Sequence, residues 1–191
     1  MNKHATAVAD QPRPFLSDIK TLRERARKHV ADGAVTPSYG AHRETVLKLL
    51  NEALATEIVC VLRYRRHYFM ADGAIGQAIK GEFLKHAKEE QAHADLIAER
   101  IVQLGGEPDF NPGSLTRRSH SEYAEGETLA SMIEEDLIAE RVAIESYTEM
   151  IAYLEGVDST SRRMLEGILA NEEEHAEELA SMLKSVRGNA K

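Results

Sequence analysis

The 191-residue sequence has one cysteine, Cys60, and five prolines, and no apolar run approaches the roughly 20 residues that span a bilayer. A single cysteine excludes an internal disulfide framework and any zinc or rubredoxin-type iron site built on Cys-x-x-Cys. The N-terminus has no apolar stretch long enough for a secretory signal, so we expect a cytoplasmic protein with no membrane partner. The net charge of −8 argues against a dedicated nucleic-acid binder and fits a protein that handles cations.

Glutamate is the abundant residue that stands out. Of the 32 acidic residues, 24 are Glu and 8 are Asp. Because Glu is a good helix former, much of this excess suits exposed helix surfaces. The few prolines avoid the long periodic segments, which favours an all-helical fold. The functional question is therefore which of the glutamates point into the core.

The apolar pattern predicts a polar N-terminal tail, a short helix and four long helices. We expect the short helix over residues 17–31 and the long ones over residues 41–71, 76–104, 127–155 and 159–187. Short connections within each pair predict two antiparallel hairpins, whereas residues 107–126 are long enough to cross the bundle. This order predicts an all-α four-helix bundle with one long crossover between the second and third bundle helices. Residues 1–40 would form the tail and short helix, and residues 41–191 the bundle.

Each long helix carries an apolar stripe that polar residues interrupt near its middle. The first and third helices contribute one Glu each, and the second and fourth contribute a Glu-x-x-His motif: Glu57, Glu90, His93, Glu140, Glu172 and His175. A carboxylate in a bundle core is strongly disfavoured unless its charge is compensated. Four in one layer would repel one another, and bound divalent cations would remove that repulsion. The pattern therefore predicts a metal site.

The spacing of these residues supports a site for two metals. Positions i and i+3 lie on one helix face, so both side chains of each Glu-x-x-His motif can converge on one point. Glu57 precedes Glu90 by 33 residues, and Glu140 precedes Glu172 by 32 residues, which suggests a pseudo-two-fold arrangement. Roughly one Glu-x-x-His is expected by chance in a chain so rich in Glu and His. Two copies, each centred on an apolar stripe, favour the metal site over a charged bundle with incidental matches.

These residues resemble bacterioferritin and its haem-free, Dps-like relatives in the ferritin-like superfamily. The resemblance covers roughly residues 44–183, and the segments that carry it are residues 50–57, 90–95, 136–140 and 172–175. It implies the ferritin-like fold, in which a long crossover joins the two hairpins. The same arrangement of a Glu on two helices and Glu-x-x-His on the other two is typical of di-iron and di-manganese carboxylate proteins.

The resemblance also implies roles for the six residues and for one tyrosine. Two iron ions per subunit would bind, with manganese as an alternative: Glu57 and His93 as terminal ligands of one, Glu140 and His175 of the other, and Glu90 and Glu172 as bridges. Four carboxylates and two imidazoles make a mainly hard site, which suits these metals. Tyr64 resembles a tyrosine that lies beside the di-iron centre in the family; core packing with a satisfied hydroxyl is the alternative.

Three departures from the family pattern refine the expectation. Gln91 stands where bacterioferritin has its haem-ligating Met, so we predict no haem. Only 16 residues follow His175, which leaves no room for the short fifth helix of the 24-subunit ferritins and favours a homo-oligomeric dodecamer shell. Standard Dps proteins build their metal site between two subunits, whereas this chain holds all six ligands itself.

The resemblance implies an iron storage and detoxification protein with ferroxidase activity, which oxidises Fe(II) with O2 or H2O2. One alternative is a peroxide-consuming di-metal enzyme, such as a rubrerythrin-like peroxidase or a manganese catalase. The other is a Dps-like shell that protects DNA. Residues 1–32 hold seven Lys and Arg against four Asp and Glu, a weak basic excess, so we do not expect DNA as a partner.

Several other polar residues lie within the predicted bundle helices. Cys60 is expected to be a buried, inert thiol. His86, on the same helix face as Glu90, is expected to be a packed or partly exposed histidine. Consecutive residues point in different directions on a helix. We therefore expect separate inter-subunit ion pairs from the basic cluster Arg63, Arg65, Arg66 and His67.

Overall fold

The computed structural model describes residues 17–188, and these fall into two units that divide after Pro37. In the first unit, helix α1 (Ile19–Lys28) contains no buried residue. The Asp18 side chain accepts hydrogen bonds from the backbone N–H groups of Lys20 at 2.9 Å and Thr21 at 3.3 Å. Because these contacts satisfy free N–H groups of the first turn, α1 begins two residues later than the sequence pattern predicts.

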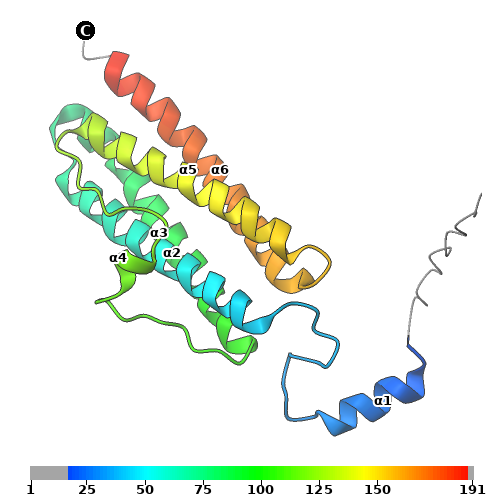
Figure 1. Cartoon of the computed structure of the whole chain (residues 1–191). Coiled ribbons are helices and arrows are strands. Elements are labelled where there is room, and N and C mark those ends of the chain that lie inside the picture. Colours follow the sequence, from blue (N-terminus) through cyan, green and yellow to red (C-terminus); the bar gives the residue numbers. More distant parts are fainter. Residues whose placement is uncertain (1–16, 189–191) are drawn as a thin grey trace, which may run out of the picture. The chain divides into compact units, whose positions relative to one another are not determined.

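The second unit is built from four long helices and one short one (Figure 1). The helices are α2 (Arg43–Met70), α3 (Gly73–Gln103), α4 (Leu115–Arg118), α5 (Leu129–Leu154) and α6 (Ser159–Gly188). α2 packs against α3, and α5 packs against α6, with further contacts between α2 and α5 and between α3 and α6. No strand occurs within residues 17–188. The prediction of an all-α four-helix bundle with one long crossover is confirmed.

The connection between α2 and α3 is shorter than the apolar pattern of the sequence predicts. α3 begins at Gly73, three residues before its predicted start. Gly73 has a φ of 68°, in the left-handed region that glycine adopts without a Cβ penalty. The chain therefore reverses direction over only Ala71 and Asp72, and the two helices run side by side from that turn.

The crossover between α3 and α5 is held against α2 by side chains of that helix. The Asn51 side chain donates to the carbonyl of Glu107 at 3.3 Å and accepts from the N–H of Asp109 at 2.7 Å. Thr56 Oγ1 accepts from the N–H of His120 at 2.9 Å. The short helix α4, which has too few residues to show a periodic pattern, also packs on α2.

Arg63 and His67 do not form the inter-subunit ion pairs predicted for the basic cluster. Both are buried, and both bind Asp136 of α5: Arg63 Nε lies 2.8 Å from Oδ1, and His67 Nδ1 lies 2.8 Å from Oδ2. Arg63 Nη1 also donates to the carbonyl of Glu122 at 2.9 Å, and His67 Nε2 lies 2.9 Å from the carbonyl of Glu125. The prediction was wrong here because these side chains connect α2, α5 and the crossover inside one chain.

Candidate metal centre

The six predicted ligands meet in one layer of the bundle core. Their exposed fractions range from 0% for Glu172 to 4% for His93. Two overlapping groups bring potential ligand atoms within 4.8 Å of one another: Glu57, Glu90, His93 and Glu172 in one, and Glu90, Glu140, Glu172 and His175 in the other. Glu90 and Glu172 belong to both groups. The structure thus places these two carboxylates where the family resemblance assigns the bridges; their role as ligands stays a prediction.

The two imidazoles face the carboxylates through their Nδ1 atoms. His93 Nδ1 lies 3.0 Å from Glu172 Oε1 and 3.3 Å from Glu57 Oε2. His175 Nδ1 lies 3.3 Å from both Glu90 Oε1 and Glu172 Oε2. Each helix supplies its side chain from the middle of a buried stripe, so regular helix geometry fixes the layer.

The buried polar atoms of the cluster fit a pair of cations. Among the described residues, the side-chain atoms that are buried without a hydrogen-bond partner include Glu57 Oε2, Glu90 Oε1, His93 Nδ1, both Glu172 oxygens and His175 Nδ1. Burying a polar group without a partner costs about 1–3 kcal/mol. That cost would be removed if these atoms coordinated cations, and oxygen and imidazole donors are suitable ligands for divalent iron or manganese.

The protonation states of the cluster reflect the crowding of charge. Burial and the neighbouring Glu90 carboxylate raise the pKa of Glu57 from 4.5 to about 8. Burial also raises the pKa of Glu140 well above its ordinary range. Burial acts to lower the pKa of His175, but the neighbouring Glu172 and Glu90 carboxylates outweigh it and raise that pKa from 6.5 to about 10. The metal-free cluster therefore retains protons that bound cations would displace.

The metal-free protein is expected to lose stability as pH rises. Because the pKa of Glu57 is higher in the folded chain, its contribution to stability is complete below about 4.5 and is lost as pH rises through about 8. The contribution of His175 to stability is likewise lost as pH rises, between its ordinary pKa of 6.5 and about 10. Calorimetry of chelator-treated protein should show a melting temperature that falls between about pH 6 and about pH 9. Saturating Zn(II) should reduce or reverse this fall, since cations replace the protons; a metal-free melting temperature that rises with pH would contradict the assignment.

Two tyrosines each bind a cluster carboxylate of the opposite hairpin. Tyr64 of α2 donates its hydroxyl hydrogen bond to Glu140 of α5, and Tyr147 of α5 donates to Glu57 of α2. Both tyrosines are buried, and burial is the main cause that raises the pKa of each well above its ordinary value. The structure therefore brings Tyr64 to the cluster.

Sequence reasoning missed Tyr147, because helical periodicity does not distinguish a tyrosine that binds a carboxylate from an apolar core residue. A signal was present: Tyr147 follows Glu140 by seven residues, the spacing that separates Tyr64 from Glu57. The two hydroxyl–carboxylate contacts extend the pseudo-two-fold relation beyond the six predicted ligands.

Replacing Tyr147 by phenylalanine is expected to weaken Co(II) binding at the Glu57 position about tenfold. The variant keeps the ring but loses a hydrogen bond to a carboxylate, and such bonds contribute about 1.5–3 kcal/mol. Anaerobic Co(II) titration followed by absorbance measures the effect. Tyr153→Phe, whose ring is 45% exposed on the same helix, is the control. Equal affinities for Tyr147→Phe and the native chain would contradict the role of the hydroxyl.

Other polar residues surround the cluster. His175 Nε2 lies 2.9 Å from Glu89 Oε2, a carboxylate contact of the kind that orients a metal-ligating imidazole. His86 is fully buried and stacks on His175 with ring centroids 4.1 Å apart. Burial lowers the pKa of His86, and the neighbouring His175 lowers it further. Of the two expectations for His86, packed or partly exposed, the structure shows the packed one.

Cys60 is buried beside the cluster, and burial raises the pKa of its thiol well above the ordinary value. Its sulfur accepts a hydrogen bond from Arg63 Nη2 at 3.4 Å. This geometry agrees with the buried thiol that the sequence predicts.

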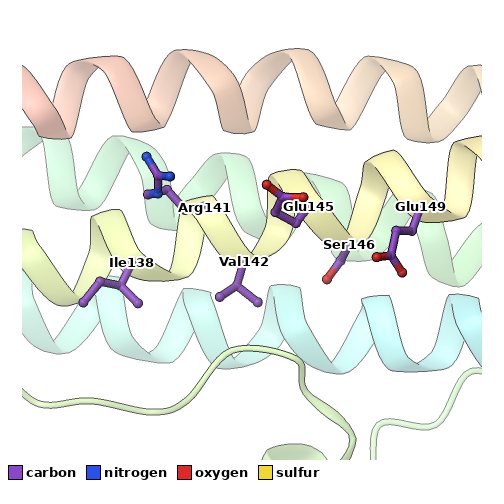
Figure 2. Close-up of a pocket in the computed structure, with 6 residues that line it drawn as sticks. All are labelled: Ile138, Arg141, Val142, Glu145, Ser146 and Glu149. Carbon is purple, nitrogen blue, oxygen red and sulfur yellow. The ribbon is translucent and has the colours of Figure 1, made fainter.

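The cluster is enclosed by the bundle rather than placed at a surface groove. A groove of about 440 Å³ follows the outer side of α5 (Figure 2) and includes none of the six residues. Its lining residues are Ile138, Arg141, Val142, Glu145, Ser146 and Glu149. None of the six residues therefore opens into this groove.

Comparisons with known proteins agree with this fold. The family model described as "Ferritin-like domain" matches residues 47–188. The chain belongs to the ferritin-like family. Within it, the sequence is 34% identical to a bacterioferritin from Mycobacterium leprae over 140 residues, 72% of this chain and 83% of the relative. It is 31% identical to a nutrient stress-induced DNA-binding protein from a Synechococcus strain over 137 residues, 70% of this chain and 78% of the relative.

Solved structures of the ferritin-like family superimpose on the bundle. A dodecameric thioferritin, the bacterioferritin-related protein from Bacteroides fragilis, matches with a TM-score of 0.75 and 30% identity, covering 79% of this chain and 91% of the other. Dps from Thermosynechococcus elongatus matches with a TM-score of 0.71 and 22% identity, covering 73% and 90%. The predicted resemblance to bacterioferritin and Dps-like proteins is confirmed. No helix within residues 17–188 is long and apolar enough to cross a membrane.

Proposed function

We propose that this ferritin-like chain stores and detoxifies iron by oxidising Fe(II) at the buried cluster. The observation that carries the proposal is the set of buried ligand atoms without hydrogen-bond partners, which α2, α3 and α6 contribute. Glu140 of α5 lies within 4.8 Å of the potential ligand atoms of Glu90, Glu172 and His175. A core of this kind would be costly without cations. The bacterioferritin relatives support iron as the metal.

The ligand roles follow from which residues share a group. Glu57 and His93 would hold one Fe(II), and Glu140 and His175 the second. Glu90 and Glu172 would contact both, because each belongs to both groups. Tyr64 and Tyr147 would orient the two terminal carboxylates, and Glu89 would orient His175. Manganese could occupy the same donors.

The reaction is a two-electron transfer from the substrate iron to an oxidant. Two Fe(II) lose one electron each; O2 takes up both electrons and two protons to give H2O2, or H2O2 takes them up to give two water molecules. The chain contributes geometry and charge: it brings two cations together and surrounds them with carboxylates that favour the higher charge of Fe(III).

Storage requires an assembly that can enclose the oxidised iron. We propose a homo-oligomeric shell of 12 chains. The dodecameric thioferritin supports this number, because 91% of that chain superimposes on this one. The absence of a haem-ligating Met at Gln91 supports a haem-free protein.

The test combines Fe(II) oxidation with size-exclusion chromatography. Metal-free protein mixed with Fe(II) in air should oxidise it rapidly and elute as a large hollow particle that retains the iron. A monomer or dimer that oxidises iron without retaining it would overturn the storage proposal. Fast turnover of H2O2 by the manganese-loaded protein, with slow iron oxidation, would instead favour a manganese catalase or rubrerythrin-like peroxidase.

DNA binding is not expected to be part of the function. The weak basic excess of residues 1–32 supports little attraction to phosphates. A gel-shift titration should give the same weak result with the full chain and with a chain that lacks residues 1–32. Strong binding that depends on residues 1–32 would support the DNA-protecting alternative, for which the Synechococcus relative is a precedent.

A further inference from the structure

An acidic groove lies between α3 and α6, away from the six residues of the buried cluster. Its volume is about 490 Å³. Four carboxylates line it: Glu82 of α3, and Glu174, Glu177 and Glu178 of α6. Carboxylates of one sign that line a hollow raise the local concentration of cations. The groove is therefore a place where divalent cations would collect.

His86 places a buried imidazole behind this groove, against Glu178, which lines it. Its side chain is fully buried, and its Nε2 lies 2.8 Å from Glu178 Oε2, a carboxylate that is about one-third exposed. Glu82, His86 and Glu178 each offer a ligand atom within 4.8 Å of the others. One imidazole and two carboxylates are a suitable ligand set for a divalent transition metal, which distinguishes this triad from the carboxylates elsewhere in the groove.

The same histidine also belongs to the inner cluster. Together with Glu140 and His175, His86 forms a further group of three potential ligands. Its Nδ1 is buried and, within the described part of the chain, has no hydrogen-bond partner. The ring stacks on His175 at 4.1 Å. His86 is thus shared by a group that contacts the groove and a group that contacts the proposed iron ligands.

We propose that Glu82, His86 and Glu178 form an outer cation site, from which divalent cations pass along His86 to the inner cluster. Cation binding at the outer site requires only Glu82, His86 and Glu178 and does not depend on the proposed function. The transfer rests on the proposed function, because it requires the inner residues to hold metal. The groove thereby gives the enclosed cluster an access point at α3 and α6.

Lys85 binds one carboxylate of this proposed site, that of Glu178. Its ammonium lies 3.0 Å and 3.1 Å from the two Glu178 oxygens. The Lys85 side chain is 41% exposed, and its flexible stem lets the charged end move into water. A divalent cation would displace it, so removing the ammonium should strengthen binding at the outer site.

Anaerobic Co(II) titration of the full chain, followed by calorimetry and visible absorbance, tests the outer site. Glu178→Gln and Glu82→Gln should each bind one Co(II) per chain fewer than the native protein under conditions that fill the outer site, with affinity there reduced at least about tenfold. Lys85→Met should increase that affinity. In stopped-flow mixing, the absorbance of Co(II) at the inner cluster should appear several-fold more slowly in Glu178→Gln.

Glu177→Gln is the matched control, because Glu177 lines the same groove and loses the same charge but lies outside the triad. It should bind as many ions as the native chain. An unchanged ion count in Glu178→Gln and Glu82→Gln, or an equal loss in Glu177→Gln, would overturn the outer site. Glu172→Gln separates the two proposals: it should impair inner binding and leave the outer Co(II) in place. If the outer ion binds and the inner cluster holds none in the native chain, the proposed function fails while the outer site stands.

Discussion

Replacing Glu172 by alanine is expected to abolish fast Fe(II) oxidation. Glu172 is fully buried, and its two oxygens contact both imidazoles, at 3.0 Å from His93 Nδ1 and 3.3 Å from His175 Nδ1. Its loss would remove a contact to both proposed iron positions at once. Changes in residues that only support metal ligands cost about 10–100-fold, so the oxidation rate should fall by more than about 100-fold. Stopped-flow absorbance of Fe(III) formation measures this rate.

The neighbouring residue provides a control for charge and position. Glu173 follows Glu172 on α6 and is exposed, so Glu173→Ala makes the same change outside the cluster and should oxidise iron at the native rate. Glu172→Gln keeps the shape of the side chain and relieves repulsion among buried carboxylates. This variant should unfold at a temperature no lower than the metal-free native chain while still oxidising iron slowly. Native oxidation rates in both Glu172 variants would contradict the proposed centre.

The bundle and the convergence of the six residues could be predicted from the sequence, because both follow from the regular periodicity of the helices. A Glu that interrupts an apolar stripe must face the same core as its neighbours, and two hairpins of nearly equal length place four such positions at one level. Tyr147 was missed for a related reason. The periodic pattern counts tyrosine as an apolar core residue, so it cannot show that the hydroxyl binds Glu57.

The helical periodicity of the sequence could not predict which side chains from distant parts of the chain contact one another. Arg63 pairs with Asp136, which lies 73 residues later, and His86 pairs with Glu178, 92 residues later. Helical periodicity states which face a residue occupies but not which residue of another helix lies opposite. The crossover contacts are harder still, since Arg63 and His67 bind backbone carbonyls of an irregular segment. Such pairs depend on how far the packed helices are offset along their axes, and local residue types do not specify that offset.

Replacing Asp136 by alanine is expected to lower the free energy of unfolding by about 3–5 kcal/mol, the cost of leaving a buried charge without its partner. The Arg63 side chain is 1% exposed and the Asp136 side chain is fully buried. Without the carboxylate, the Arg63 guanidinium would keep its hydrogen bonds to the Glu122 carbonyl and the Cys60 sulfur but lose its buried counter-charge, and His67 would lose its Nδ1 contact. Denaturant titration monitored by circular dichroism measures the loss. Proteolysis of residues 119–126 should also become faster, because Arg63 and His67 hold that part of the crossover.

Two further variants separate the buried charge from general damage to α5. Glu134→Ala removes a carboxylate from the same helix, but its partner Arg187 is exposed, and such surface pairs contribute about 0–1 kcal/mol. A double variant, Arg63→Met with Asp136→Leu, removes both charges and should recover much of the stability lost in Asp136→Ala, because apolar residues often replace a buried ion pair without loss. Stability of Asp136→Ala equal to that of Glu134→Ala would show that the buried network does not hold the crossover. The double variant could recover stability while residues 119–126 stay open to proteolysis. That result would show that packing alone restores the bundle, whereas the charges position the crossover.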